Sequence, residues 1–169
     1  MNNSFAFKYG FILFALLTSF FTLMWAFGQA DQTWLRIFNG VIHFGLLYFA
    51  ILNYRKTFPE TYGNYLSGVG TGMIISAIGS ILFAFVIALF ANLDGGFAAA
   101  IEKDIPYNAN LIPFSAALFV FVEGIAAGLI GSYFMTRVVN AQMLKSSTGQ
   151  ANFNINYNSN AHINPTSVK

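Results

Sequence analysis

Residues 66–91 read LSGVGTGMIISAIGSILFAFVIALFA, a stretch that carries no charged side chain and is apolar for most of its length. A helix rises about 1.5 Å per residue and the hydrocarbon core of a bilayer is roughly 30 Å thick, so about 20 mostly apolar residues cross it. A run of this length and character is typical of a membrane-spanning helix. It therefore predicts the class of the whole fold.

Three further apolar runs accompany this stretch. Together the four predicted spans cover about residues 9–27, 34–53, 66–91 and 111–136, and aromatic residues near their ends suit the two membrane interfaces. The composition agrees, because 56% of the 169 residues are hydrophobic and only 8% are charged, whereas about a quarter are charged in an average soluble domain. We expect an all-α integral membrane protein, an antiparallel four-helix bundle over residues 1–145.

Charge distribution predicts how this bundle is oriented. One side would carry most of the basic residues, namely Lys8, Arg55, Lys56, Arg137, Lys145 and Lys169. The other side would carry Arg36 and Lys103 together with Asp31, Asp94, Glu102 and Asp104. Basic residues favour the cytoplasmic side, so both termini are expected in the cytoplasm. A cleaved signal peptide ending at Gly28-Gln29-Ala30 is the alternative for the first span, but its apolar run is longer than the roughly 7–15 residues typical of such peptides.

Two segments outside the spans are read from composition. Residues 146–169 are rich in Asn, Ser and Gly, which bury little apolar surface, and this predicts a mobile cytoplasmic tail. Within it, Phe153, Ile155 and Tyr157 alternate with Asn, the period of a strand, so a strand or docking motif is the alternative. In the third connection, residues 97–105 fit a short interfacial helix or, equally, a solvated loop.

Several functional classes are excluded by composition. A net charge of +2 without a long basic run argues against nucleic-acid binding. The absence of cysteine excludes disulfides and thiolate metal sites, and the two histidines, His43 and His162, are remote in sequence. The glycines at 68–72 lie in an apolar span and lack the lysine and flanking strand of a nucleotide loop. We expect no cofactor, no metal and no enzymatic activity.

Small residues repeat at every fourth position of the third span and recur in the fourth. In the third span they are Gly68, Gly72, Ser76, Ser80, Ala84 and Ala88; in the fourth they are Gly124, Gly128 and Gly131. Residues four apart share one face of a helix, and in lipid a small-residue face lets another helix approach closely. These two helices are the best candidates for an intimate pair, and self-association is the alternative role of the face.

Polar side chains at membrane depth are the candidates for function. Glu123 falls near the centre of the fourth span, where an ionised carboxylate costs at least a few kcal/mol. In the second span, Arg36, Asn39 and His43 share one face, and Asn53 extends this polar stripe further along the helix. Because His43 and Glu123 lie at similar depth, we consider a contact between them. It would be a buried hydrogen bond that fixes helix rotation, or a protonatable couple in a transport or sensing path; the third possibility is no contact.

Two short motifs flank the second connection: Asn53-Tyr54-Arg55-Lys56 at the exit of the second span and Tyr65-Leu66-Ser67-Gly68-Val69-Gly70 at the entry to the third. With these motifs the chain resembles, over roughly residues 5–141, a bacterial domain-of-unknown-function family of small four-pass inner-membrane proteins. It implies a bacterial inner membrane and carries over no functional residue, because the family has no assigned activity.

Taken together, these observations favour a non-enzymatic membrane protein of structural or accessory type. Its surroundings would be the lipid bilayer, and its partner a second copy of the chain or another membrane protein. The alternative is a small transporter or proton-coupled channel component that uses Glu123 and His43.

Overall fold

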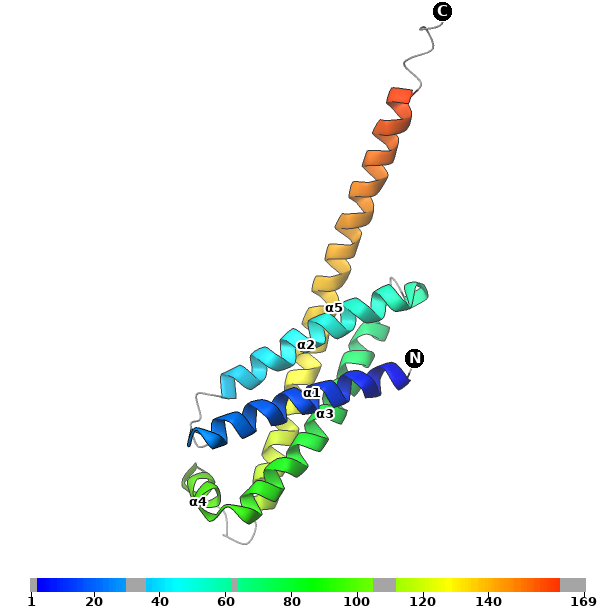
Figure 1. The fold of residues 1–169 in the computed structure, drawn as a ribbon. Coiled ribbons are helices and arrows are strands. Elements are labelled where there is room, and N and C mark those ends of the chain that lie inside the picture. The colour runs from blue at the N-terminus through cyan, green and yellow to red at the C-terminus, as the bar shows by residue number, and fades with distance from the viewer. Residues whose placement is uncertain (1–2, 30–35, 62–63, 105–111, 162–169) are drawn as a thin grey trace, which may run out of the picture.

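The computed structural model describes residues 3–29, 36–61, 64–104 and 112–161. Within these ranges the regular structure is entirely helical. Its elements are α1 (Asn3–Ala26), α2 (Arg36–Thr57), the short 3-10 helix η2 (Pro59–Thr61), α3 (Tyr65–Leu93), α4 (Gly95–Asp104) and α5 (Ile112–Ala161), as Figure 1 shows. The all-α class predicted from the sequence is confirmed.

Four helices in the described ranges are long and apolar enough to cross a membrane. The qualifying segments are Ser4–Ala26, Ile37–Thr57, Tyr65–Leu93 and Pro113–Lys145. Each predicted span corresponds to one of these helices, so the predicted number and order of long apolar helices are confirmed. The helices extend beyond the predicted spans at several ends because the predictions follow the apolar runs, whereas a helix continues through polar residues.

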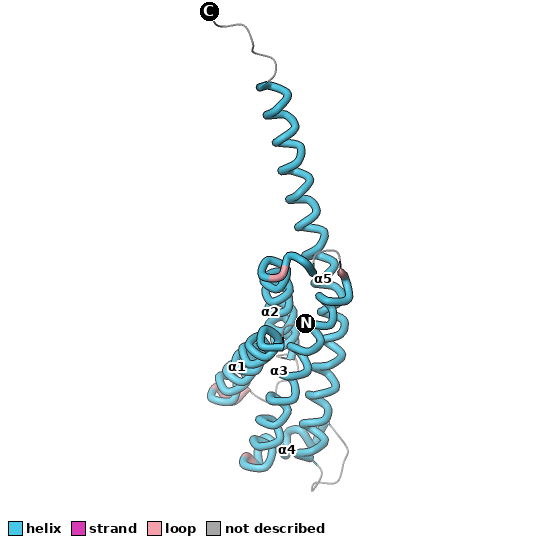
Figure 2. The backbone as a smooth tube through the Cα atoms, turned by 90° about the vertical axis from the view of Figure 1, so that its right-hand side faces the viewer, coloured by secondary structure: helices cyan, strands magenta, loops and turns pink. Residues whose placement is uncertain are grey.

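The four long helices pack as two crossed layers. α1 and α2 run in opposite directions in one layer, and α3 and α5 run in opposite directions in the other (Figures 1 and 2). The interface between α3 and α5 is the most extensive in the molecule. Between the layers lies a core of apolar side chains that includes Leu13, Leu47, Ile75 and Phe83.

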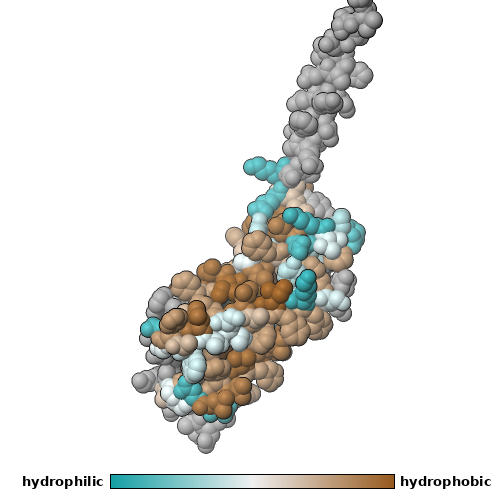
Figure 3. Space-filling model, in the orientation of Figure 1, coloured by the Kyte–Doolittle hydropathy of each residue, from teal (hydrophilic) through white to brown (hydrophobic). Residues whose placement is uncertain are grey.

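The outer surface of these helices is apolar. Large hydrophobic side chains point outward on every long helix, among them Phe11, Ile37, Phe85 and Ile130. On the face seen in Figure 3, brown, hydrophobic residues make up most of the body, and hydrophilic residues gather near its ends. The interior of the structure is therefore no more apolar than its surface. It differs from the surface in its close packing and in its polar contacts.

Outside the predicted spans, the structure selects one of two alternatives for one segment and differs from the expectation for another. Residues 97–105 were compatible with a helix or a loop, and the structure has the helix α4, which ends at Asp104; residue 105 lies outside the described ranges. The segment 146–169, expected as a mobile tail, is helical as far as Ala161, and Figure 1 shows this part of α5 projecting from the body. Extending an existing helix avoids the cost of nucleating one, which explains why the helix passes the end of the apolar span.

Candidate functional site

The glycines of α3 and α5 bring these two helices into close contact. A Cβ added to Gly124 would lie 2.6 Å from Ser80 Cβ, and one added to Gly128 would lie 2.6 Å from Ser76 Oγ. Neither distance is compatible with a real side chain, so only hydrogen fits at these two positions. The small-residue faces predicted from spacing therefore meet each other here.

The same interface continues toward the start of α3. Gly68 lies against Thr136 and Gly72 against Ser132. Since positions rising along α3 meet positions falling along α5, the two helices are antiparallel. Of the remaining predicted packing residues, Ala84 is buried, Ala88 is half-buried, and Gly131 lies on another side of α5 against Phe44 and Leu47 of α2. Gly131 thus joins α5 to α2.

His43 lies where α2, α3 and α5 meet. Its side chain is buried, and its Nε2 atom is 2.8 Å from Ser76 Oγ in a hydrogen bond. Ser76 is also the residue that faces Gly128. The imidazole therefore anchors α2 to the closely packed α3–α5 interface, and a polar pair replaces apolar packing at this level of the bundle.

Glu123 lies away from His43, so the two side chains do not make the contact considered from the sequence. Its side chain is exposed on the outer face of α5, and it makes no hydrogen bond or ion pair with any residue the structure describes. Five positions along a helix correspond to a rotation of about 140°, so a helix that turns Gly128 toward Ser76 turns Glu123 away from it. The two residues share a depth but not a face.

The other polar residues predicted on α2 do not form one continuous site. Asn39 is half-buried, and its Oδ1 atom has no hydrogen-bond partner among the described residues. The Arg36 side chain lies outside the described part of the chain. Asn53 at the far end donates to the hydroxyl of Tyr9 at 2.6 Å. The predicted polar stripe is therefore divided between a core position at His43 and a position near the helix end.

Arg55 is an important polar residue that the sequence did not single out as a site. It is 1% exposed, and its guanidinium donates to the carbonyl oxygens of Thr61 and Asn64 and to Ser67 Oγ. The bond to Asn64 O measures 2.9 Å and the bond to Ser67 Oγ 3.1 Å. One side chain thus holds the end of α2, the connection after it and the start of α3 together.

Asp94 joins three helices at the opposite end of the molecule. Its Oδ2 atom accepts a hydrogen bond from Trp25 Nε1 of α1 at 2.8 Å. Its Oδ1 atom accepts from the backbone N–H groups of Gly96 at 2.9 Å and Phe97 at 3.2 Å, and so caps the first turn of α4. The bond from Trp25, followed by the bonds from the α4 backbone, lowers the pKa of the Asp94 carboxyl below its ordinary value.

A pH titration tests the role of Asp94. Because its pKa is lower in the folded state than in the unfolded state, its contribution to stability is complete above the unfolded value and is lost as the pH falls through the folded value. We expect acidification below about pH 4 to release the Trp25 indole, which a change in Trp fluorescence would report. Asp94→Asn should remove that transition; a transition that is unchanged in Asp94→Asn would contradict the assignment.

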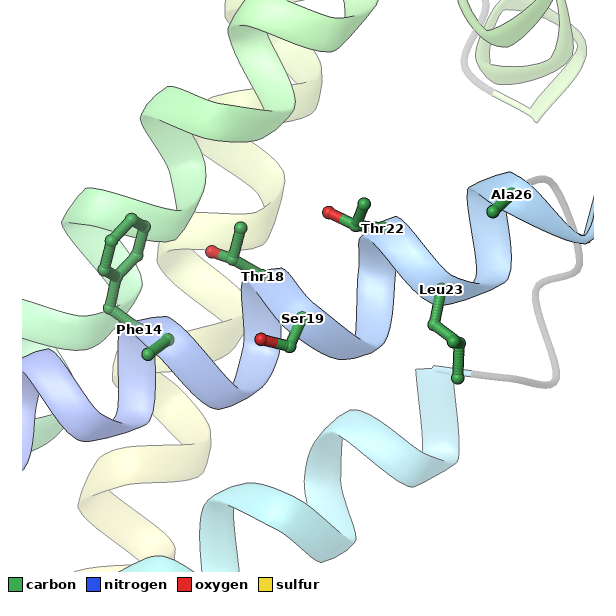
Figure 4. A pocket seen from close by; sticks show the side chains of 7 residues that line it. Phe14, Thr18, Ser19, Thr22, Leu23 and Ala26 are labelled. Carbon is green, nitrogen blue, oxygen red and sulfur yellow. The ribbon is translucent and has the colours of Figure 1, made fainter.

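A shallow groove runs along α1. It is lined by Phe14, Ala15, Thr18, Ser19, Thr22, Leu23 and Ala26, and Figure 4 shows its three hydroxyl groups along one stretch of the helix. All of its lining comes from one helix, and its polar atoms are hydroxyls without a charged neighbour in the lining. The lining of the groove contains no carboxyl, imidazole or amino group that could act as an acid or a base.

A double-mutant cycle tests the pairing of His43. We expect His43→Asn and Ser76→Ala to be coupled by about 0.5 to 2 kcal/mol, because each substitution removes the partner of the other in the apolar interior. Stability would be measured by unfolding in mixed micelles. The matched control combines His43→Asn with Glu123→Gln, whose effects should add. Coupling in the control without coupling to Ser76 would show that the assigned partner is wrong.

Comparisons with protein-family models, with curated protein sequences and with solved structures each find no match to this chain.

Proposed function

We propose that this protein is a non-enzymatic integral membrane protein that crosses the bilayer four times and acts in a structural or accessory role, by packing against other membrane helices. The observation that carries this proposal is the apolar outer surface. Phe85 is 73% exposed, Ile37 70% and Ile130 64%, each on a different long helix. Soluble monomers rarely expose contiguous apolar patches beyond a few hundred Å², whereas lipid covers such a surface without cost.

The contacts of several tyrosines support placing one membrane interface at one end of the molecule. Tyr9 bonds to Asn53, the Tyr48 hydroxyl donates to Gln142 Oε1 at 2.9 Å, and the Tyr65 hydroxyl donates to the Tyr133 carbonyl at 2.6 Å. All of these contacts involve the second half of α2 or the first turn of α3, so they lie toward the end of the molecule where α2 ends and α3 begins. Tyrosine and tryptophan prefer the headgroup level, and Trp25 lies toward the other end, so the apolar bodies of the helices fill the thickness between them.

Orientation follows from the charges at these two ends. The exposed cations belong to the end that carries the tyrosines, because Lys8 lies near the start of α1, Lys56 near the end of α2, and Arg137 and Lys145 beyond the part of α5 that meets the start of α3. Asp94 follows the end of α3 and belongs to the other end. By the positive-inside rule the tyrosine end faces the cytoplasm, together with both termini. The membrane that we propose, the inner membrane of a bacterium, rests on the family resemblance of the two short motifs around residues 53–56 and 65–70.

The contacts of the polar groups within the proposed spans favour a packing role over a transport role. A transport path needs polar groups that converge on a wet cavity, whereas His43 and Ser76 bond to each other between helices. Glu123 faces outward, toward lipid or another protein. The polar groups therefore serve contacts between helices, which is what an accessory or structural protein requires.

Single-cysteine labelling tests insertion and orientation, and the native chain has no cysteine to remove. Gly95→Cys and Glu60→Cys place thiols on exposed residues at opposite ends. An impermeant maleimide added to spheroplasts should label Gly95→Cys only, and label both after lysis. The reverse pattern would overturn the orientation. Release of the protein from membranes by alkaline carbonate would overturn the proposal that it spans the bilayer.

A further inference from the structure

The outer face of α5 carries a second regular pattern, distinct from its small-residue face. Five residues follow one another at alternating spacings of four and three, and all of them are exposed: Phe119, Glu123, Ala126, Ile130 and Tyr133. An average spacing of 3.5 residues is the heptad period, which keeps one seam of a helix turned toward a partner helix. We refer to these five residues as the outer seam. Tyr65 of α3 contacts Tyr133 at one end of the seam, and Glu123, Ala126 and Ile130 stay exposed along its middle.

Glu123 at the centre of the outer seam needs a partner from outside the chain. It lies about 16 Å along the helix from Ile112 and about 15 Å from Tyr133, too far for its side chain to reach water at either end. A carboxyl group in contact with hydrocarbon alone is costly, so such residues normally turn inward or pair. The fold has turned this one outward and has left it without a hydrogen bond to any described residue.

A second copy of the chain supplies a matching partner by symmetry. All copies insert in the same orientation, so Glu123 of one copy lies at the same depth as Glu123 of another, and two α5 helices that meet side by side are parallel. A two-fold axis along the membrane normal then brings identical residues together. The carboxyl group suits this arrangement, because the O–H of one can donate to the oxygen of the other.

The residues beside Glu123 suit the same contact. Ala126 lies one turn further along the seam, and its small side chain lets two helices approach closely. Phe119 and Ile130 supply apolar surface on either side. In coiled coils, one polar residue in an otherwise apolar seam fixes the register and the number of helices. Glu123 occupies the corresponding position here.

We propose that the protein forms a parallel homodimer through the outer seam, with the Glu123 carboxyl groups of the two copies hydrogen-bonded to each other. The proposal rests on the proposed membrane insertion, which fixes the parallel orientation. The partner in the proposed packing role is a second copy of this chain, and the contact surface is one face of α5.

Disulfide crosslinking in native membranes tests this proposal. Ala126→Cys places a thiol on the outer seam, and Ala15→Cys places one at similar depth on the exposed side of α1 as a matched control. With copper phenanthroline as oxidant, Ala126→Cys should form a disulfide-linked dimer and Ala15→Cys should remain monomeric. Adding Glu123→Leu to Ala126→Cys should lower the dimer yield roughly tenfold, whereas Glu123→Gln, whose amide also donates and accepts, should preserve it.

Each alternative result is decisive. Monomeric Ala126→Cys, equal crosslinking of the α1 control, or a yield unaffected by Glu123→Leu would overturn the dimer, as would crosslinking of Ala126→Cys to a different protein. Sedimentation equilibrium of the unmodified chain in detergent gives an independent answer if Glu123→Leu does not fold, and a monomer at all concentrations overturns the proposal. Alkaline carbonate separates the two claims: a chain that stays in the membrane without dimerising refutes the dimer alone.

Discussion

Replacing Arg55 with alanine is expected to destabilise the protein by about 3 kcal/mol, because hydrogen bonds from a charged donor contribute more than neutral ones and their loss leaves acceptors without a partner. The guanidinium donates to Thr61 O, Asn64 O and Ser67 Oγ, so its removal frees the connection between α2 and α3. Unfolding in mixed detergent micelles would measure the change. Since α3 carries the interface with α5, the loosened connection should also lower the unfolding cooperativity.

Two variants control this prediction. Lys56→Ala removes the neighbouring, exposed cation, and its effect should stay within about 0.5 kcal/mol. Arg55→Lys keeps the charge but replaces the planar fork by one ammonium group, which cannot reach all three acceptors, so its loss should be intermediate. If Arg55→Ala were no more harmful than Lys56→Ala, the charge of Arg55 would matter only for orientation and the assigned contacts would be wrong.

The contacts of Arg55 could not be predicted from the sequence. A basic residue just after an apolar run indicates the cytoplasmic end of a span, and nothing in Asn53-Tyr54-Arg55-Lys56 tells a buried arginine from a solvated one. The four long helices could be predicted because each requirement, length and apolar character, is local. The contacts of Arg55 depend on where the chain returns after η2, and that is not a local property.

For Glu123 and His43 in the candidate site, the sequence likewise predicts one property, their depth, and leaves another open, their direction. Their depth in the spans follows from counting residues along a helix. Their directions depend on the rotation of α2 and α5, which is set by what each helix packs against. The small residues of α3 and α5 contained that information: once Gly124 and Gly128 face α3, Glu123 must face away. Ser76, predicted only as a packing residue, proved to be the partner of His43.

Gly128→Leu is expected to destabilise the protein by about 3 kcal/mol, at the upper end of the usual cost of overpacking. A Cβ at this position would lie 2.6 Å from Ser76 Oγ, so α3 and α5 would have to separate. Separation would also pull Ser76 away from His43 and weaken the contact with α2. Thermal unfolding in detergent, followed by circular dichroism, would measure the loss.

The matched control for this prediction is Gly45→Leu on α2. Nothing lies within 4 Å of a Cβ added there, and the position is exposed. The same change in side chain should therefore leave stability within about 0.5 kcal/mol of the native chain, or raise it slightly through the better helix propensity of leucine. Equal losses at both positions would mean that leucine is harmful for a reason common to both helices. A loss confined to Gly128 would place it in the α3–α5 contact, the one interface that also positions His43 and turns Glu123 outward.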